Sequence, residues 1–515
     1  MASHNIPDVS LGSMIAKRSS LTPTNRALTF EGTTWTYAQM LERIDRLALA
    51  LRDGGAAKGD RVAYLGLNHP AFFVTMFAAA RLGAIFVPLN FRLTGPELDF
   101  IINDSGVHSV VADDAHKAVL DEIRGGLPCR RYIGAEGGGG GWEALGQILG
   151  ASDPLSETTK VDADDVALIM YTSGTTGRPK GAMLTHGNIA WNNINALHGP
   201  PSGTDEVCLT VAPLFHIGGL NVGTLLTMQK GGEVVLHRSF DPGAALEAIE
   251  RYGVTTMFGV PAMYLFMSQH PRFEATDFSS VRLFLVGGAP VPEPLLKIYN
   301  GKGIPFAQGY GLTETSPFSA LLLPEYAVDK VGSAGKGPLY SELAVLDPDD
   351  NPCPPGARGE ICTRGPNVMA GYWNRPEATA EAIDTEGWFH SGDLGYFDED
   401  GFLFVVDRVK DMVITGGENV YPAEVESVLY EHPKVGEVAI IGLPDDRWGE
   451  AVTAVVALKA GQQLTLDELR DFGAQRLARY KLPTRLETID VLPRNPAGKV
   501  LKFGLREHYG DASPT

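Results

Sequence analysis

The stretch YTSGTTGRPKG, from Tyr171 to Gly181, determines how the rest of this sequence is interpreted. It follows the apolar run VALIMY, which predicts a buried strand. Its glycines let backbone N–H groups approach phosphate oxygens closely, Ser173, Thr175 and Thr176 add hydroxyl donors, and Lys180 adds positive charge. The spacing differs from G-x-x-x-x-G-K-[ST], which excludes a P-loop NTPase. The stretch still predicts a phosphate-binding loop.

Helical and strand-like runs alternate on both sides of this loop, which predicts parallel sheets covered by helices. Apolar residues at helical spacing predict helices, and short apolar runs predict buried strands. The predicted helices are Thr36 to Gly54, Ala71 to Leu82 and one starting at Thr185; the predicted strands are Arg61 to Gly66, Ala84 to Leu89 and Val281 to Val286.

The last hundred residues have a different pattern, which starts near Tyr421. The pattern predicts helices at Pro422 to Glu431 and Leu466 to Leu477, and strands at Val438 to Gly442 and Val452 to Leu458. This compact αβ pattern has the size of an independent small domain. Short strands and turn sequences such as DPDDNPCPP predominate before it, from about residue 340.

The composition limits the classes of function. The 515 residues carry 43 basic and 62 acidic side chains, and a net charge of −19 argues against a nucleic-acid partner. The four cysteines form no C-x-x-C pair, which predicts neither a zinc site nor a disulfide scaffold and fits a cytoplasmic location. The N-terminus has no apolar signal region, and Arg81, Gly83 and Pro88 interrupt the most apolar stretch. We therefore expect no integral membrane segment, and leave a homodimer open.

Six motifs in one order make this sequence similar to the adenylate-forming superfamily of acyl-CoA synthetases, coumarate–CoA ligases, firefly luciferase and peptide-synthetase adenylation domains. The motifs are YTSGTTGRPKG, APLFH (212–216), QGYGLTET (308–315), HSGDLG (390–395), VDRVKDMVITGGENVYPAEVE (406–426) and PRNPAGK (493–499). The tracts GGENVYPAEVE and ARYKLP (478–483) most resemble bacterial fatty-acyl-CoA and feruloyl-CoA ligases.

The resemblance implies an α/β fold. Residues 1–409 would form a large N-terminal domain of stacked αβαβα sheets with a β-barrel-like subdomain, which binds ATP and the acid. Residues 410–515 would form a small, mobile α+β lid that rotates about a hinge near Lys410 between two half-reactions.

The resemblance also implies an AMP-forming acid–CoA ligase. ATP and a carboxylic acid would give acyl-AMP and pyrophosphate, and the acyl group would then pass to coenzyme A with release of AMP. The expected acid is a medium- to long-chain fatty acid. The alternatives are an aryl or hydroxycinnamic acid, as in feruloyl-CoA synthetase, and loading of a carrier protein.

For the nucleotide, the resemblance assigns roles to residues in these motifs. Tyr310 would stack on the adenine, Asp393 would accept both ribose hydroxyls, and Thr313 would contact the AMP phosphate. Glu314 and Thr176 would hold Mg²⁺, since a carboxylate near a triphosphate needs a cation between them. The other residues expected in the nucleotide site are Thr172, Ser173, Gly174, Thr175, Lys180, Gly288, Ala289, Gln308, Gly309, Gly311 and Arg408.

Lys499 lies in a loop rich in proline and glycine near the C-terminus. By resemblance its ammonium would contact the α-phosphate and the attacking carboxylate, and would neutralise charge that develops in the transition state. Thr176 and Glu314 are the other two residues expected to be catalytic. Acylation of Lys499 would remove that charge and stop the first step.

The resemblance also predicts where coenzyme A and the acid bind. Arg238 would meet the ribose phosphate of coenzyme A, and the GGEN tract would offer a backbone surface for its pantetheine: Gly416, Gly417, Glu418 and Asn419. The hinge residue Lys410 is also expected among the cofactor-binding residues. The acid pocket would be lined by His216, Gly218, Val222, Gly309, Pro317 and Phe318. Gly218 and Val222 replace a tyrosine and a serine that meet the phenol in hydroxycinnamate ligases, which predicts an open, apolar tunnel instead.

Two further alternatives differ in class. A luciferase-like oxygenase shares the motifs, but nothing in the sequence supports oxygen chemistry, and the final DASPT lacks the peroxisomal S-K-L. A nucleotide-binding protein without turnover would not need Lys180, Glu314, Asp393 and Lys499 together.

Overall fold

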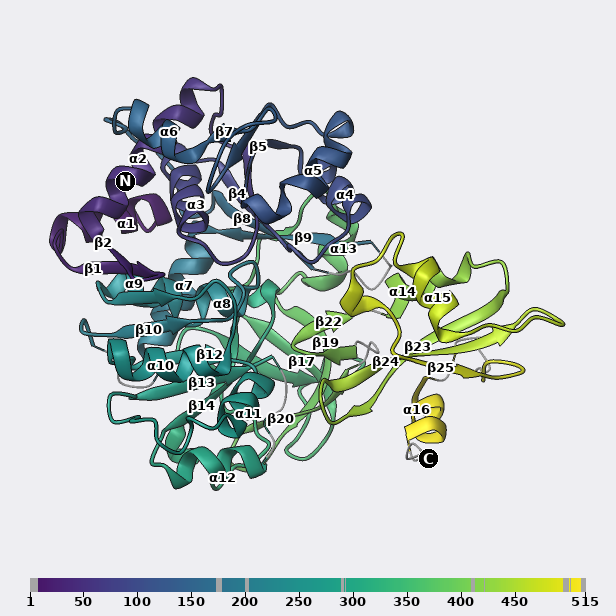
Figure 1. Ribbon diagram of the computed structural model, residues 1–515. Coiled ribbons are helices and arrows are strands. Elements are labelled where there is room, and N and C mark those ends of the chain that lie inside the picture. Colours follow the sequence, from purple (N-terminus) through teal and green to yellow (C-terminus); the bar gives the residue numbers. More distant parts are fainter. Residues whose placement is uncertain are drawn as a thin grey trace. The chain divides into compact units, whose positions relative to one another are not determined.

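The computed structural model describes residues 8–172, 178–199, 203–288, 291, 293–408, 413–420, 422–493, 500 and 502–510 (Figure 1). The chain divides into two compact units, which are described separately. The larger unit comprises residues 1–91, 102–170 and 181–406, and the smaller comprises 92–101, 171–180 and 407–515. Lys410 lies outside the described residues, so the boundary at 409 and the hinge remain predictions.

Two eight-stranded sheets make up most of the larger unit. The first has the order β15-β14-β13-β12-β10-β11-β1-β2 and is parallel except at its two edge strands. Its strands are β1 (Arg26–Phe30), β2 (Thr33–Thr36), β10 (Val207–Thr210), β11 (Glu233–Leu236), β12 (Thr256–Gly259), β13 (Leu283–Gly287), β14 (Phe306–Gly311) and β15 (Phe318–Leu322).

The second sheet has the order β18-β9-β8-β4-β3-β5-β6-β7, and its parallel pairs run from β8 to β7. Its strands are β3 (Arg61–Leu65), β4 (Ile85–Leu89), β5 (Val107–Ala112), β6 (Arg131–Gly134), β7 (Glu143–Ala144), β8 (Val166–Thr172), β9 (Lys180–Thr185) and β18 (Gly371–Tyr372). The alternation in the sequence correctly predicted parallel sheets.

Helices fill the space between the two sheets and cover their outer faces (Figure 1). The inner layer shares one core with both sheets, and in α3 every residue except Arg81 is buried, which explains its all-round apolar sequence. The inner helices are α1 (Leu11–Leu21), α2 (Tyr37–Asp53), α3 (Pro70–Leu82), α7 (His186–Leu197), α8 (Ile217–Asn221) and α9 (Thr224–Lys230). On the outer face of the first sheet, a second core rich in aromatic residues contains α10 (Pro242–Tyr252), α11 (Pro261–Gln269) and α12 (Glu293–Gly301).

Two smaller sheets follow. An antiparallel sheet with the order β16-β17-β19-β20 accounts for the predicted barrel-like part: β16 (Glu342–Leu346), β17 (Gly359–Arg364), β19 (Phe389–Phe397) and β20 (Leu403–Arg408). The smaller unit has the order β22-β21-β24-β23, with β25 on β24. Its elements are β21 (Val413–Thr415), β22 (Glu418–Val420), α14 (Pro422–Tyr430), β23 (Val435–Asp445), β24 (Gly449–Leu458), α15 (Leu466–Gly473), β25 (Arg485–Thr488) and α16 (Lys502–Gly510).

The structure corrects three local predictions. Strand β9 lies between the phosphate-binding motif and α7, where only a loop was predicted, and its neighbours in the sheet are β8 and β18. Thr185 is the N-cap of α7 and accepts the backbone N–H of Asn188. Helix α15 ends at Gly473, before the predicted Leu477, and Asp393 lies within β19 rather than on a turn after a strand.

Within the described ranges, none of the helices combines the length and apolarity that crossing a bilayer requires. The four cysteines are free thiols.

Candidate active site

Strands β14 and β19 bring together the two residues predicted to bind adenine and ribose. Tyr310 lies near the carboxyl end of β14, and its hydroxyl donates to Oδ2 of Asp393 at 2.8 Å. Asp393 is 3% exposed, so this bond forms largely out of water. Because hydrogen bonds to a charged acceptor are stronger than neutral ones, the pair fixes where the carboxylate points.

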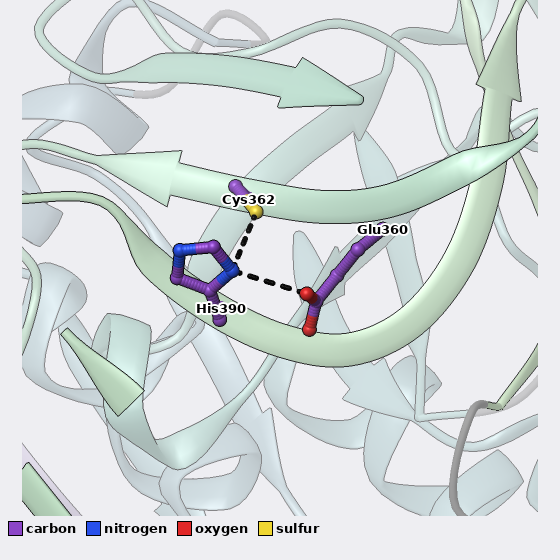
Figure 2. Close-up of side chains that lie close together, drawn as sticks. All are labelled: Glu360, Cys362 and His390. Carbon is purple, nitrogen blue, oxygen red and sulfur yellow. Dashed lines mark hydrogen bonds and ion pairs between the residues drawn. The ribbon is translucent and has the colours of Figure 1, made fainter. Parts of the chain in front are cut away.

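The backbone before Asp393 is held by side chains from the neighbouring strand β17 (Figure 2). Oε1 of Glu360 accepts the backbone N–H of Gly392 at 2.8 Å, and its Oε2 lies 3.0 Å from Nδ1 of His390. The same Nδ1 lies 3.5 Å from Sγ of Cys362, which is buried, and burial raises the pKa of this thiol well above its usual range. Gly392 has φ +72°, which favours glycine. Glu360 therefore positions the bend that presents Asp393.

Glu314, the predicted magnesium ligand, lies in the 3₁₀ turn η3 (Thr313–Thr315) directly after β14. Its side chain is buried, and Oε1 accepts a hydrogen bond from the Tyr372 hydroxyl at 3.0 Å. Carboxylate oxygens are the ligands that a hard cation such as Mg²⁺ prefers, so Glu314 remains the predicted ligand. Thr176, the other predicted ligand, lies outside the described residues.

Three buried asparagines hold the segment from Thr315 to Phe318, and sequence analysis did not find them. Asn367 Nδ2 donates to the carbonyls of Thr315 and Phe318 at 2.7 and 2.8 Å. The Oδ1 of Asn192 accepts the N–H of Phe318, and Asn221 Nδ2 donates to the carbonyl of Ser316. Asparagine on a buried helix face is the sequence signal that could have identified α7 and α8 as supports.

Two glycines predicted for the nucleotide site are required by the backbone. A Cβ at Gly311 would lie 1.6 Å from the carbonyl oxygen of Pro317, so that any other residue would displace the loop. Gly288, directly after β13, has φ +81°.

The other predicted nucleotide residues are described on their own elements, within each unit. Thr172 ends β8 and its Oγ1 lies 3.5 Å from the carbonyl oxygen of Lys180, which starts β9. Gln308 and Gly309 lie on β14, and the backbone of Arg408 ends β20. The predicted residues outside the described ranges are Ser173, Gly174, Thr175, Thr176, Ala289, Lys410 and Lys499.

The predicted coenzyme A tract is only partly a surface. Gly416 and Gly417 form the exposed turn between β21 and β22, and Asn419 is exposed. Glu418 is buried and forms an ion pair with Arg92, so its carboxylate does not belong to that surface.

The guanidinium of Arg238 forms two ion pairs. Its Nε lies 2.9 Å from Oε1 of Glu31, and its Nη1 lies 2.8 Å from Oε1 of Glu136. These carboxylates compete with the phosphate that we expected Arg238 to bind.

Two of the predicted acid-pocket residues, Val222 and Phe318, line a cavity of about 520 Å³, a volume that includes space open to solvent. Gly309 borders it, since a Cβ there would lie 3.4 Å from the Phe318 ring. Pro317 directly precedes Phe318, and His216 is the N-cap residue of α8, its ring centroid 4.2 Å from that of Phe215. The structure thus brings Val222, Gly309 and Phe318 close together within the larger unit.

The tunnel expected beside Gly218 is not open. A Cβ at Gly218 would lie 2.9 Å from Cε1 of Phe258, because the Phe258 ring from β12 fills the space that the glycine leaves. That expectation was wrong, because the sequence around Gly218 does not show which side chain of a distant strand occupies the space.

The comparisons with known proteins agree with this arrangement. The AMP-binding enzyme family model matches residues 15–373, and the model of the AMP-binding enzyme C-terminal domain matches residues 424–499. A feruloyl-CoA synthase from an Amycolatopsis species is 47% identical over 97% of this chain and 99% of the relative. A long-chain-fatty-acid–CoA ligase from Mycobacterium tuberculosis is 39% identical over 98% of this chain and 99% of the relative.

Among solved structures, an o-succinylbenzoate–CoA synthetase from Bacillus subtilis, bound with its product analogue, is similar with a TM-score of 0.86 and 35% identity. The match covers 96% of this chain and 98% of that chain. This chain therefore belongs to the AMP-binding enzyme family and is an AMP-forming acid–CoA ligase.

Proposed function

We propose that this enzyme is an aryl acid–CoA ligase that activates a hydroxycinnamic-type acid. The observation that carries the proposal is the 47% identity to a feruloyl-CoA synthase over almost the whole of both chains. The identity to the long-chain-fatty-acid–CoA ligase is lower, at 39% over a similar length. The fatty-acid substrate expected from the sequence is therefore less well supported than its aryl alternative.

The proposed chemistry has two steps that use the residues of the larger unit in defined ways. The acid's carboxylate attacks the α-phosphorus of ATP, pyrophosphate leaves, and acyl-AMP forms. The thiol of coenzyme A then attacks the acyl carbon, and AMP leaves. The protein orients the reactants and stabilises charge, and forms no covalent bond with them.

In this scheme the Tyr310–Asp393 pair orients the ribose, because the Tyr310 hydroxyl holds Oδ2 of Asp393 and the Ser391 hydroxyl accepts the backbone N–H of Asp393. Glu314 is the described residue that would hold Mg²⁺, and the bound ion would neutralise phosphate charge. Lys499 would contact the α-phosphate in the first step. The roles of Thr176, Lys499 and the hinge at Lys410 remain proposals from the sequence.

A pyrophosphate-release assay with purified enzyme, Mg²⁺ and ATP tests the proposal across ferulate, coumarate, benzoate, octanoate, dodecanoate and hexadecanoate. We expect kcat/KM to be highest for a hydroxycinnamate. A maximum at dodecanoate or hexadecanoate would refute the aryl assignment. Omitting coenzyme A separates the two steps, since a carrier-loading enzyme would form acyl-AMP but no thioester with coenzyme A.

A further inference from the structure

Three side chains with metal-binding atoms meet on one face of the antiparallel sheet (Figure 2). Glu360 and Cys362 lie two positions apart on β17, and His390 on β19 is paired with Cys362. Residues two apart on a strand, and residues paired across neighbouring strands, present their side chains to the same face of the sheet. The strand pairing thus gathers a carboxylate, a thiol and an imidazole, and one ligand atom of each lies within 4.8 Å of the other two.

The distances among the three ligand atoms suit a tetrahedral metal ion. Nδ1 of His390 lies 3.5 Å from Sγ of Cys362 and 3.0 Å from Oε2 of Glu360. With zinc bonds of about 2.0 Å to nitrogen and oxygen and about 2.3 Å to sulfur, a tetrahedral site places the nitrogen about 3.5 Å from the sulfur and about 3.3 Å from the oxygen. The first separation already has this value, and the second needs only a small movement of the Glu360 carboxylate.

A metal ion would satisfy contacts that one proton cannot. A proton on Nδ1 of His390 can be donated with good geometry to Oε2 of Glu360 or to Sγ of Cys362, but not to both. A metal ion accepts an electron pair from all three atoms at once. On binding, the Cys362 thiol would release its proton to solvent, because the thiolate is the form that binds metals.

The other ring nitrogen of His390 lies near a carboxylate that can support a metal-bound imidazole. Nε2 of His390 lies 3.7 Å from Oδ2 of Asp384, so a slight shift of the ring would bring the two atoms within hydrogen-bond distance. Asp384 is itself held in place, since its Oδ1 accepts the backbone N–H groups of Glu386 and Trp388 at 2.9 and 2.8 Å. A histidine that binds a metal usually donates its second N–H to such a carboxylate, which fixes the ring and makes the ligating nitrogen more basic.

The three residues lie partly open to solvent. Cys362 is fully buried, whereas the side chains of His390 and Glu360 are 19% and 32% exposed. A metal ion can therefore enter from the exposed side, and water can supply a fourth ligand. Oε1 of Glu360 accepts the N–H of Gly392, so a metal bound through Oε2 alone would leave the bend before Asp393 in place.

We propose that Glu360, Cys362 and His390 bind one thiophilic divalent metal ion of the zinc class. Asp384 is the outer partner of His390 in this site. A thiolate and an imidazole favour Zn²⁺ over Mg²⁺, which prefers oxygen ligands and is predicted at Glu314 instead. The sequence predicted no zinc site, because Cys362 and His390 are 28 residues apart and form no local motif. The proposal does not depend on which acid the enzyme activates.

The test titrates the purified, chelator-treated protein with Co²⁺ in the presence of excess Mg²⁺, which occupies sites made only of oxygen ligands. We expect one Co²⁺ per chain and a thiolate-to-cobalt charge-transfer absorption, which added Zn²⁺ should abolish by displacing the cobalt. C362S should lose this absorption. C208S is the matched control and should keep it, because Cys208 is a comparably buried thiol whose neighbour at 3.8 Å is the hydroxyl of Thr210.

Two further variants test the remaining contacts by isothermal titration calorimetry with Zn²⁺. We expect D384N to raise Kd by roughly tenfold, and H390F to raise it further because a ligand is lost. A wild type without the charge-transfer absorption would overturn the proposal, and so would an equal absorption in C362S. If C362S fails to fold, H390F decides, since an unchanged Kd in the folded variant would also overturn it. These measurements report metal binding alone, so the acid profile tests the proposed function separately.

Discussion

The nucleotide side and the acid side of this enzyme are built on different principles. On the nucleotide side, polar side chains are fixed by buried hydrogen bonds, such as Tyr310 to Asp393 and Glu360 to Gly392. On the predicted acid side, Val222 and Phe318 line a cavity, and the ring of Phe258 fills the space beside Gly218. The nucleotide is the same in every turnover, and polar groups recognise it through hydrogen bonds of fixed direction. The acid varies between relatives. Apolar groups select the acid by its volume, so a single substitution can change which acid fits.

This difference makes a general prediction. Substitutions on the predicted nucleotide side should lower kcat/KM by a similar factor for every acid, whereas substitutions at the predicted acid-pocket residues should change the ranking of acids. Each prediction below is therefore measured with two acids, ferulate and dodecanoate.

The largest effect is expected from K499A. Removing the ammonium should lower the rate of acyl-AMP formation by roughly 10²–10³-fold, because an electrostatic contact to the transition state is lost. Thioester formation from supplied acyl-AMP should be retained. Both steps are measured separately, by pyrophosphate release and by thioester absorbance, and an equal loss in both would contradict the assigned role.

A smaller effect is expected from Y310F, which deletes only the hydroxyl that binds Asp393. Hydrogen bonds to a charged group contribute about 1.5–3 kcal/mol, so kcat/KM for ATP should fall roughly ten- to a hundredfold with both acids. Y326F, at a tyrosine that is 42% exposed, is the control. A loss confined to one acid would place Tyr310 in the acid pocket instead.

N367L tests the support of the loop that joins the two sides. Asn367 is fully buried, and its loss leaves the carbonyls of Thr315 and Phe318 without their donor. We expect a loss of about 2–5 kcal/mol in the free energy of unfolding, measured by urea denaturation. N300L at the exposed end of α12 should change it by less than about 0.5 kcal/mol. An unchanged stability of N367L would show that water replaces the amide.

E360Q should give the smallest effect. The glutamine keeps the size of Glu360 and can still accept the Gly392 N–H, but loses the charge near His390. We expect KM for ATP to rise roughly three- to tenfold with both acids, since the bend before Asp393 is held less firmly. E360A should give a larger rise, and equal values for E360Q and E360A would mean that the charge, not the bond to Gly392, positions the bend.

The order of most elements and the family could be predicted from the sequence, whereas the roles of the nucleotide-site residues stay predictions. The periodicity that places α2 and α3 is local, and the six motifs identify Tyr310, Glu314 and Asp393 by their neighbours in the chain. Strand β9 was missed because its sequence, KGAMLT, does not alternate regularly between polar and apolar residues; in the sheet it lies between β8 and β18. The asparagines of α7 and α8 were missed because their acceptors belong to a distant loop.

The sequence by itself determined the family, the sheets and the residues expected to handle ATP, because these depend on residues that are close together in the chain. Only the tertiary structure decided the shape of the acid pocket. Gly218, Phe258 and Gly287 come from three separate elements, and the Phe258 ring fills the space that the two glycines leave. Volume is a property of how distant segments pack, and no local pattern encodes it.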